Sequence, residues 1–285
     1  MLGAIIGDIV GSRFEFNNHR SKEFELFTDD CFATDDSIMT LAIAKALMEC
    51  RESLDTQFVR SQLNHHAREC MRRIGRKYPN CGFGGMFFRW IFSDEPEPYN
   101  SFGNGAAMRV SPCGFYAPTE EKAKTISRAV TEVTHNHPEG IKGAEAVTVA
   151  IFLAKTGASK EQIRNRIESD YYKLDFTIDG IRPTYRFNET CQETVPPALE
   201  AFLESTSFED CIRIAISVGG DSDTLAAIAG AIAEAYYGIP LNIKEAALGY
   251  LDYELTAIYH EWEDFALAIR KKDFDDYEDE ISAKP

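Results

Sequence analysis

The sequence has no uninterrupted apolar stretch as long as the ~18 residues that a membrane-spanning helix requires. Residues 1–11 are largely apolar, but Asp8 interrupts the run and no basic residue precedes it. This pattern argues against a secretory signal peptide. We therefore expect no membrane association.

Paired cysteines are also lacking. The seven cysteines are odd in number and scattered along the chain, and none belongs to a Cys-x-x-Cys pair. This distribution favours neither a disulfide framework nor a zinc ribbon. Unpaired thiols are typical of a reducing compartment, so the expected location is the cytoplasm.

Positive charge is scarce. Thirty Lys and Arg residues stand against 46 Asp and Glu residues, which gives a formal net charge of -16. Such a chain repels phosphate backbones at long range, so nucleic acid is not an expected partner. Part of the acidic excess lies in residues 271–285, which we expect to form a solvated or frayed tail.

The chain of 285 residues contains no Pro/Gly/Ser-rich linker and no repeat of solenoid period. A length of ~150 residues per domain would allow two domains. Because no boundary is visible, we predict one domain over residues 1–270 followed by the acidic tail, with a monomer as the expected state.

Helical periodicity dominates what is present. Between residues 37 and 50, apolar side chains recur at the three-to-four spacing of a buried helix face. Comparable patterns predict helices over residues 119–133, 143–155, 160–169, 195–203, 208–217, 225–237 and 255–269. Only residues 176–181 alternate as a strand would, so we predict an all-α fold in a single compact helical domain.

Two further features concern packing and loops. Alanine and glycine fill residues 226–233, which predicts a central helix that its neighbours approach closely. Residues 75–85 and 94–104 are rich in Gly, Pro and Asn. Such long segments bind ligands when a rigid scaffold holds them.

Two acidic segments stand directly before apolar helical runs: Thr34-Asp35-Asp36 and Asp221-Ser222-Asp223-Thr224. Each is expected at a helix N-terminus, where capping explains one such residue per helix. Clustered acids with threonine hydroxyls exceed that need, and oxygen ligands without His or Cys suit Mg²⁺ or Mn²⁺ better than Zn²⁺. From these residues alone, a divalent-metal site and two helix caps remain alternatives.

A third segment, residues 101–109, reads Ser-Phe-Gly-Asn-Gly-Ala-Ala-Met-Arg. Its small residues let a backbone approach a ligand, and its consecutive N–H groups could hold a diphosphate. Phe102 could stack on a sugar or a base, although a core position is commoner for an aromatic residue. Taken alone, a glycine turn before a helix would look the same.

Together with residues 3–15, these segments resemble the ADP-ribosylglycohydrolase family, the hydrolases that remove ADP-ribose from protein side chains. The resemblance extends through most of the chain. Its motifs are Gly-Asp-Ile-Val-Gly-Ser-Arg-Phe-Glu at 7–15, the acidic triplet at 34–36, residues 101–109, Thr134-His135, and residues 217–224 with the Ala/Gly-rich helix that follows.

The resemblance implies an all-helical fold with a binuclear centre of two Mg²⁺ ions, Mn²⁺ being the alternative metal. The implied metal ligands are Thr34, Asp35, Asp36, Asp221, Asp223 and Thr224. The implied catalytic residues are Glu15, Asp35 and Asp223, with Glu15 matching a mobile acidic residue beside the metals. The implied substrate-binding residues are Gly84, Gly85, Ser101, Phe102, Gly103, Asn104, Gly105, Met108 and His135. Asp8 matches the pattern in a structural role.

The resemblance therefore implies a metal-dependent hydrolase of the N- or O-glycosidic bond between ADP-ribose and a protein side chain or related compound. Residues 101–109 and the Gly-Ser-x-x-Glu form at 11–15 are more similar to the branch that acts on serine-type O-linkages. The alternative is a non-catalytic ADP-ribose binder or structural protein on the same scaffold. A metal-dependent phosphoesterase lacks support, because no His/Asp ligand pattern points to one.

Overall fold

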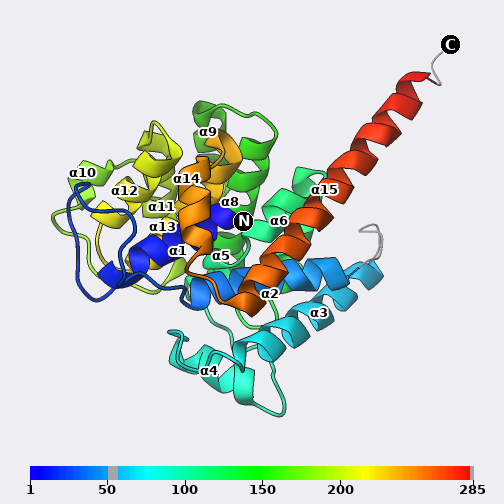
Figure 1. Cartoon of the computed structure of the whole chain (residues 1–285), viewed down its shortest axis with the longest axis horizontal. Helices are drawn as coiled ribbons and strands as arrows, with labels where there is room; N and C mark the ends of the chain where they lie inside the picture. The colour runs from blue at the N-terminus through cyan, green and yellow to red at the C-terminus, as the bar shows by residue number, and fades with distance from the viewer. Residues whose placement is uncertain (51–56, 283–285) are drawn as a thin grey trace.

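The computed structural model describes residues 1–50 and 57–282, with the side chains of 1–50 and 60–269. In this part of the chain every regular element is a helix (Figure 1). Extended backbone pairs there at one isolated bridge, between Gly103 and Thr190. The all-α prediction is confirmed.

Two helices that lie far apart in the sequence form the centre of the fold. Helix α1 (Leu2–Gly11) is buried along its whole length and packs against α13 (Ser222–Tyr237). Glycine recurs at every fourth position of α1, and a Cβ added at Gly7 would lie 2.0 Å from the carbonyl oxygen of Ala226. The two backbones are therefore in direct contact. The alanine-rich sequence of α13 correctly predicts this close, central packing.

Three more helices pack against α13: α8 (Pro138–Lys155), α11 (Cys191–Glu204) and α12 (Phe208–Ser217). Helix α11 begins four residues before its predicted start, although it contains Pro196 and Pro197. Pro197 has no N–H to offer the carbonyl oxygen of Glu193. The hydroxyl of Tyr185 donates to that oxygen instead, at 3.0 Å.

A second group of helices covers the other side of α1 and α8: α2 (Asp35–Glu49), α3 (Gln57–Gly75), α6 (Ser111–Tyr116), α7 (Glu120–Thr131) and α15 (Tyr253–Ser282). The remaining elements are short: η1 (Ser12–Phe14), α4 (Gly85–Phe92), α5 (Gly105–Met108), α9 (Lys160–Asp170), α10 (Ile178–Ile181) and α14 (Leu241–Leu248). The intervals α3–α4 and α4–α5 are the two predicted loops.

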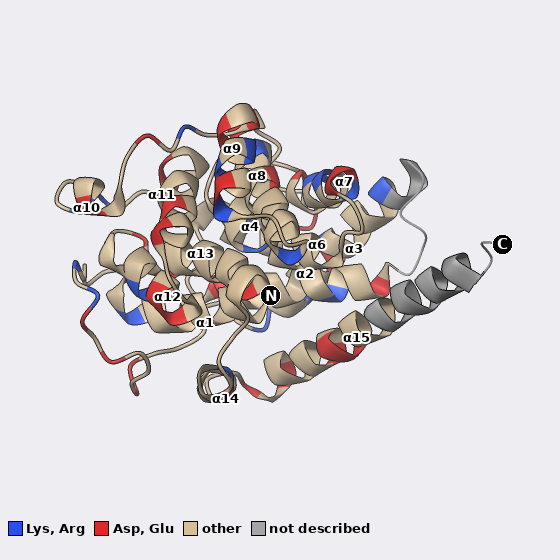
Figure 2. Ribbon diagram, turned by 90° about the horizontal axis from the view of Figure 1, so that it is seen from above, with Lys and Arg blue, Asp and Glu red and all other residues tan. Residues whose placement is uncertain are grey.

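Charged residues gather on outer helices such as α9 and α12, whereas the central α13 carries few (Figure 2). This is the arrangement that burial of α13 demands, because unpaired charges are costly in a core. Among the described residues, no helix combines the length and the apolar character needed to cross a membrane.

One sequence expectation differs from the structure. Residues 176–181 form no strand, because the side chain of Thr177 accepts from the backbone N–H of Gly180 at 3.1 Å and starts the single turn of α10. The backbone of α15 is helical to Ser282, and the expectation of a solvated or frayed acidic tail over 271–285 stays a prediction. The side chains of that tail and residues 283–285 lie outside the described part of the chain.

Candidate functional site

The two acidic segments meet in space although they are far apart in sequence. Thr34 is the N-cap of α2 and Asp221 the N-cap of α13. The hydroxyl of Thr224 donates to Oδ2 of Asp36 at 3.2 Å, across 188 residues of sequence. The helix starts thus bring both sets of carboxylates to one place.

Capping accounts for only part of this arrangement. The hydroxyl of Thr34 accepts from the backbone N–H of Asp36 at 3.4 Å, as an N-cap does. Asp221 makes no capping hydrogen bond with its side chain. Instead its Oδ2 accepts from Nδ2 of Asn104 at 2.6 Å, which ties α13 to the loop before α5.

Asp8 supports the cluster from inside α1. Its carboxylate accepts from the backbone N–H and hydroxyl of Thr34, at 2.9 and 2.5 Å, and from the backbone N–H and hydroxyl of Ser37. Burial raises its pKa to about 6, while these four hydrogen bonds oppose the shift. Asp8 therefore holds the start of α2, which is the structural role expected of it.

The carboxylates at the two helix starts are crowded. One oxygen each from Asp8, Asp36 and Asp223 lie within 4.8 Å of one another, and so do oxygens from Glu15, Asp221 and Asp223. Burial, and then the negative charge of neighbouring aspartates, raises the pKa of Asp36 and Asp223 well above the ordinary range. Oδ1 of Asp36 is buried and has no hydrogen-bond partner.

This environment fits a hard divalent cation. Several carboxylate oxygens converge, they repel one another, and one of them is an orphaned acceptor inside the protein. Oxygen-only donor sets of this kind suit Mg²⁺ or Mn²⁺. A bound cation would offset the repulsion that the buried carboxylates experience.

The cluster forms the floor of a cavity of about 710 Å³. The cavity is lined by all nine residues expected to bind substrate: Gly84, Gly85, Ser101, Phe102, Gly103, Asn104, Gly105, Met108 and His135. It is also lined by Glu15 and by five of the six expected metal ligands: Asp35, Asp36, Asp221, Asp223 and Thr224. The sixth, Thr34, does not line the cavity, because its hydroxyl points to Asp8.

Two amides of the loop before α5, which are expected to hold a diphosphate, have internal partners in this structure. Gly103 N donates to Oγ of Ser101 at 3.1 Å, and Asn104 N donates to the carbonyl oxygen of Glu189 at 2.7 Å. These contacts fix the loop against the segment before α11. Phe102 remains 42% exposed, so its ring is accessible for stacking.

Glu15 lies on the loop directly after η1 and is half-buried at the edge of the cavity. Burial, followed by the negative charges of Asp221, Asp8 and Glu189, raises its pKa to about 7. A carboxyl group with this pKa can hold or release a proton near neutral pH.

Sequence reasoning gave no role to several lining residues. Arg109 is fully buried, donates to the hydroxyl of Thr134 at 2.6 Å and lies over the ring of Phe87 at 5.2 Å. Burial, with the positive charge of Arg109, lowers the pKa of His135 well below its ordinary value, so this imidazole is neutral. A lone arginine inside an apolar run was the available signal for Arg109.

The other lining residues are Gly82, Met86, Phe87, Arg89, Tyr99, Asn100, Glu189 and Thr190. Of these, Gly82, Tyr99 and Asn100 belong to the two loops, 75–85 and 94–104, in which ligand binding is expected. Glu189 and Thr190 lie outside every motif of the sequence, because the start of α11 was placed after them. The bridge between Gly103 and Thr190 holds them beside the loop before α5, at the cavity.

Comparison with known proteins gives a consistent result. Residues 1–274 match the family model described as ADP-ribosylglycohydrolase. The chain is 26% identical to ADP-ribosylhydrolase ARH3 of Xenopus tropicalis, over 89% of this chain and 91% of that protein. It is 27% identical to ADP-ribosylarginine hydrolase Tri1 of Pseudomonas putida, over 84% of this chain and 70% of that protein. A solved structure, an ADP-ribosylglycohydrolase-related protein complex, has the same fold, with a TM-score of 0.63 and 23% identity over 90% of this chain and 93% of that chain.

Proposed function

Because the chain belongs to the ADP-ribosylglycohydrolase family, we propose that it is a metal-dependent hydrolase of the glycosidic bond between ADP-ribose and an acceptor, the acceptor being a protein side chain or a related compound. The observation that supports this most directly is the hydrogen bond between Thr224 and Asp36 on the cavity floor. It joins the two segments that would have to act together.

The residues that would hold two Mg²⁺ ions, or Mn²⁺, are those around the floor of the cavity: Asp35, Asp36, Asp221, Asp223 and Thr224, with Thr34 at their edge. When bound, such ions fix sugar hydroxyls and lower the pKa of a coordinated water. Asp8 and Asn104 keep the carboxylates in place, because the former holds the start of α2 and the latter holds Asp221.

Cleavage breaks the bond between the anomeric carbon of the ribose and the acceptor atom, and a water oxygen takes its place. The transition state has oxocarbenium character, so negative charge near the ring favours it. Glu15 would accept the proton that the water loses, and the same proton would then pass to the departing acceptor atom, so that no proton is gained or lost overall. The pKa of about 7 suits Glu15 to this exchange.

The cavity also suits the rest of the ligand. Its volume falls in the range of ~300–1,000 Å³ that is usual for small-molecule sites. Ser101 to Gly105 would contact the diphosphate and the distal part, after the amides of Gly103 and Asn104 exchange their internal partners for the ligand. The exposed ring of Phe102 offers a stacking surface, and the neutral His135 lines the same wall.

We further propose a preference for serine-type O-linkages, which rests on the form of residues 101–109 and 11–15. The similar relatives include both an ADP-ribosylhydrolase and an ADP-ribosylarginine hydrolase. The cytoplasmic location and the monomeric state remain predictions from the sequence, as does the lack of nucleic-acid and membrane partners.

The direct test incubates the purified protein with serine- and arginine-ADP-ribosylated peptides, with Mg²⁺ and after chelation, and measures released ADP-ribose. Release that depends on Mg²⁺ and is faster from the serine-linked peptide is expected. Undiminished release after complete chelation would contradict metal dependence. Binding of ADP-ribose without release from either peptide would favour a non-catalytic binder.

A further inference from the structure

Three loops each deliver one acidic residue to the cavity, and all three meet at the side chain of Arg20. The loop after η1 carries both Glu15 and Arg20. The loop between α10 and α11 carries Glu189, and the turn between α12 and α13 leads into Asp221. None of these segments has regular structure that would fix it on its own.

The guanidinium of Arg20 donates to three backbone carbonyl oxygens. Its Nη1 donates to the carbonyl oxygens of Arg182 and Val218, the latter at 2.9 Å, and its Nη2 donates to that of Tyr185 at 2.7 Å. Among the described residues no carboxylate forms an ion pair with it. These three hydrogen bonds from one planar guanidinium therefore join backbone segments.

The turn before Asp221 is shaped to receive this contact. Gly219 and Gly220 have φ values of 76° and 74°, a region that favours glycine. The amide of Gly220 donates to Oδ1 of Asn18 at 2.6 Å. A Cβ at Gly219 would lie 2.8 Å from that oxygen and 3.2 Å from Cζ of Arg20. Asn18 and Arg20 thus hold both sides of the turn.

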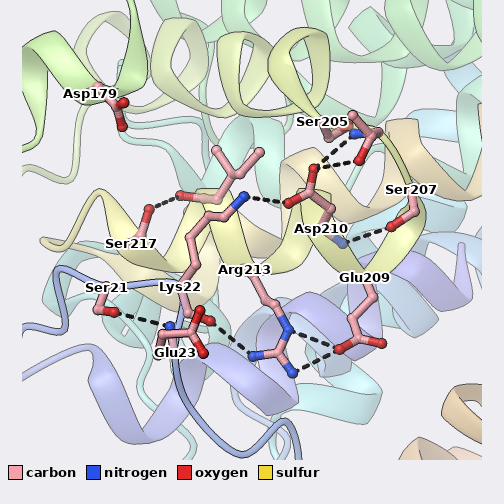
Figure 3. Close-up of polar contacts among 12 residues, drawn as sticks. Ser21, Lys22, Glu23, Asp179, Ser205, Ser207, Glu209, Asp210, Arg213 and Ser217 are labelled. Atoms are coloured by element: carbon pink, nitrogen blue, oxygen red, sulfur yellow. Dashed lines mark hydrogen bonds and ion pairs between the residues drawn. The ribbon is translucent and has the colours of Figure 1, made fainter.

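Other contacts of the same loop serve a different purpose. Lys22 forms an ion pair with Asp210 of α12 at 2.6 Å, while Arg213 pairs with Glu209 within α12 itself (Figure 3). Arg213 also donates to the carbonyl oxygens of Lys22 and Phe24, at 3.0 and 2.7 Å. These contacts attach the loop to the body of α12 and do not reach the turn before Asp221.

We propose that Arg20 is a positioning residue, which sets the separation between the Glu15 carboxylate and the Asp221–Asp223 pair by fastening their loops together. This inference rests on the proposed function. Like charges on the three loops repel one another, so the loops need a fixed connection behind the cavity. Arg20 supplies it through carbonyls, without adding a charge to the cavity lining.

The test compares Arg20→Ala and Arg20→Lys with a matched control, Lys22→Ala, which removes a cation from the same loop. The first readout is Mn²⁺ binding to the full chain without substrate. We expect about 10-fold weaker binding for Arg20→Ala, as for other residues that orient metal ligands. Arg20→Lys should recover part of the affinity, and Lys22→Ala should leave it unchanged.

The second readout is turnover. A displaced carboxylate lowers kcat more than it raises KM, by up to about 100-fold for a shift of 1 Å. The third is hydrogen exchange of residues 15–22, which should become faster in Arg20→Ala alone. Wild-type Mn²⁺ affinity and kcat in the folded Arg20→Ala protein would overturn the inference, even if its melting temperature fell.

Two other outcomes also decide the role of Arg20. If Arg20→Ala does not fold, Arg20→Lys must show reduced Mn²⁺ affinity and kcat, and normal values would overturn the inference. If the wild-type protein releases no ADP-ribose, the proposed function fails. Mn²⁺ binding and hydrogen exchange then still decide the role of Arg20.

Discussion

Glu15 shows how the charge around one residue sets its chemistry. Its raised pKa has two sources, burial and the repulsion from Asp221, Asp8 and Glu189. A raised carboxyl pKa means that the group is protonated below about pH 7 and is available as a base above it. A cation held at Asp221 cancels part of the repulsion and so lowers this pKa.

The first prediction follows from the raised pKa of Glu15 and from its lowering by a bound cation. We expect kcat/KM of the wild-type protein to rise with pH through about 7 at low Mg²⁺, and the midpoint to move to lower pH as Mg²⁺ is raised. Glu15→Gln should lower kcat by about 100-fold, the usual scale of proton-transfer catalysis, and remove this dependence. The measurement is the pH–rate profile at two Mg²⁺ concentrations. Near-normal cleavage by Glu15→Gln would make Glu15 a bystander.

The second prediction concerns Asp223, whose pKa is raised by burial and by Asp221 and Asp36. Asp223→Asn removes a buried negative charge, so it should stabilise the metal-free protein at pH 8 by about 1–3 kcal/mol. It should also lower turnover by at least about 100-fold, because a charged group on the cavity floor is lost.

Calorimetry with and without Mg²⁺ checks the stability part, with Asp30→Asn as the control because Asp30 is exposed. The control should change neither the melting temperature nor its response to Mg²⁺. If Asp223→Asn keeps the wild-type response to Mg²⁺, Asp223 is not part of the metal site.

At this scale the sequence identifies the residues that belong to short motifs. Asp36 and Asp223 are recognisable because acids and threonines cluster before apolar helices. Glu189 is not, because a loop contact that local patterns do not encode brings it to the cavity. Arg109 stands in the segment 101–109, but its full burial is not encoded there. The internal hydrogen bonds of Gly103 and Asn104 are invisible for the same reason.

At the scale of elements, the spacing of glycines in α1 matters as much as its hydrophobicity. Gly3, Gly7 and Gly11 all face α13, and a Cβ on any of them would come within 2.5 Å of a backbone or neighbouring atom. This row of three glycines therefore fixes the distance between α1 and α13. It thereby also fixes the position of Asp8, on α1, relative to the start of α13.

The third prediction uses this row of glycines. Gly7→Ala should destabilise the protein by more than about 3 kcal/mol, beyond the usual cost of overpacking, because the added carbon meets the backbone of Ala226 and not a movable side chain. Chemical denaturation measures the loss. Gly85→Ala is the control, since a Cβ there meets nothing within 4 Å. Equal stability of the two variants would refute the close contact.

Periodicity predicts the existence of long helices well and their starts less well. Helix α11 begins before its prolines because the hydroxyl of Tyr185 donates to the carbonyl oxygen of Glu193, which Pro197 leaves free. Residues 176–181 alternate, yet they have no neighbouring strand to pair with in the described chain. A strand needs such a partner, whereas a helix makes its own hydrogen bonds.

At the scale of the whole molecule, the site exists because an early and a late segment of the chain meet. Helix α1 packs on α13, which places the segment after α1 beside the N-terminus of α13. The sequence alone leaves two helix caps and one metal site as alternatives, and only the family resemblance joins the two segments. In the structure, the hydrogen bond from Thr224 to Asp36 connects these two segments directly.

The last prediction links pH, metal and global stability. Aspartates whose pKa is raised by folding bind more protons in the native state than in the unfolded state, between the ordinary pKa of ~4 and the raised value. The free energy of unfolding of the metal-free protein should therefore fall as pH rises from 5 to 8. Protons and Mg²⁺ compete for the same oxygens, so stabilisation by Mg²⁺ should grow over that interval.

At 100 times its Kd, Mg²⁺ adds about 2.7 kcal/mol to the free energy of unfolding. For a chain of this size that is a rise in melting temperature of roughly 5–10 °C at pH 8. Thermal unfolding at several pH values, with Mg²⁺ and with a chelator, measures it, and an effect of Mg²⁺ that is the same at pH 5 and pH 8 would contradict binding at these carboxylates.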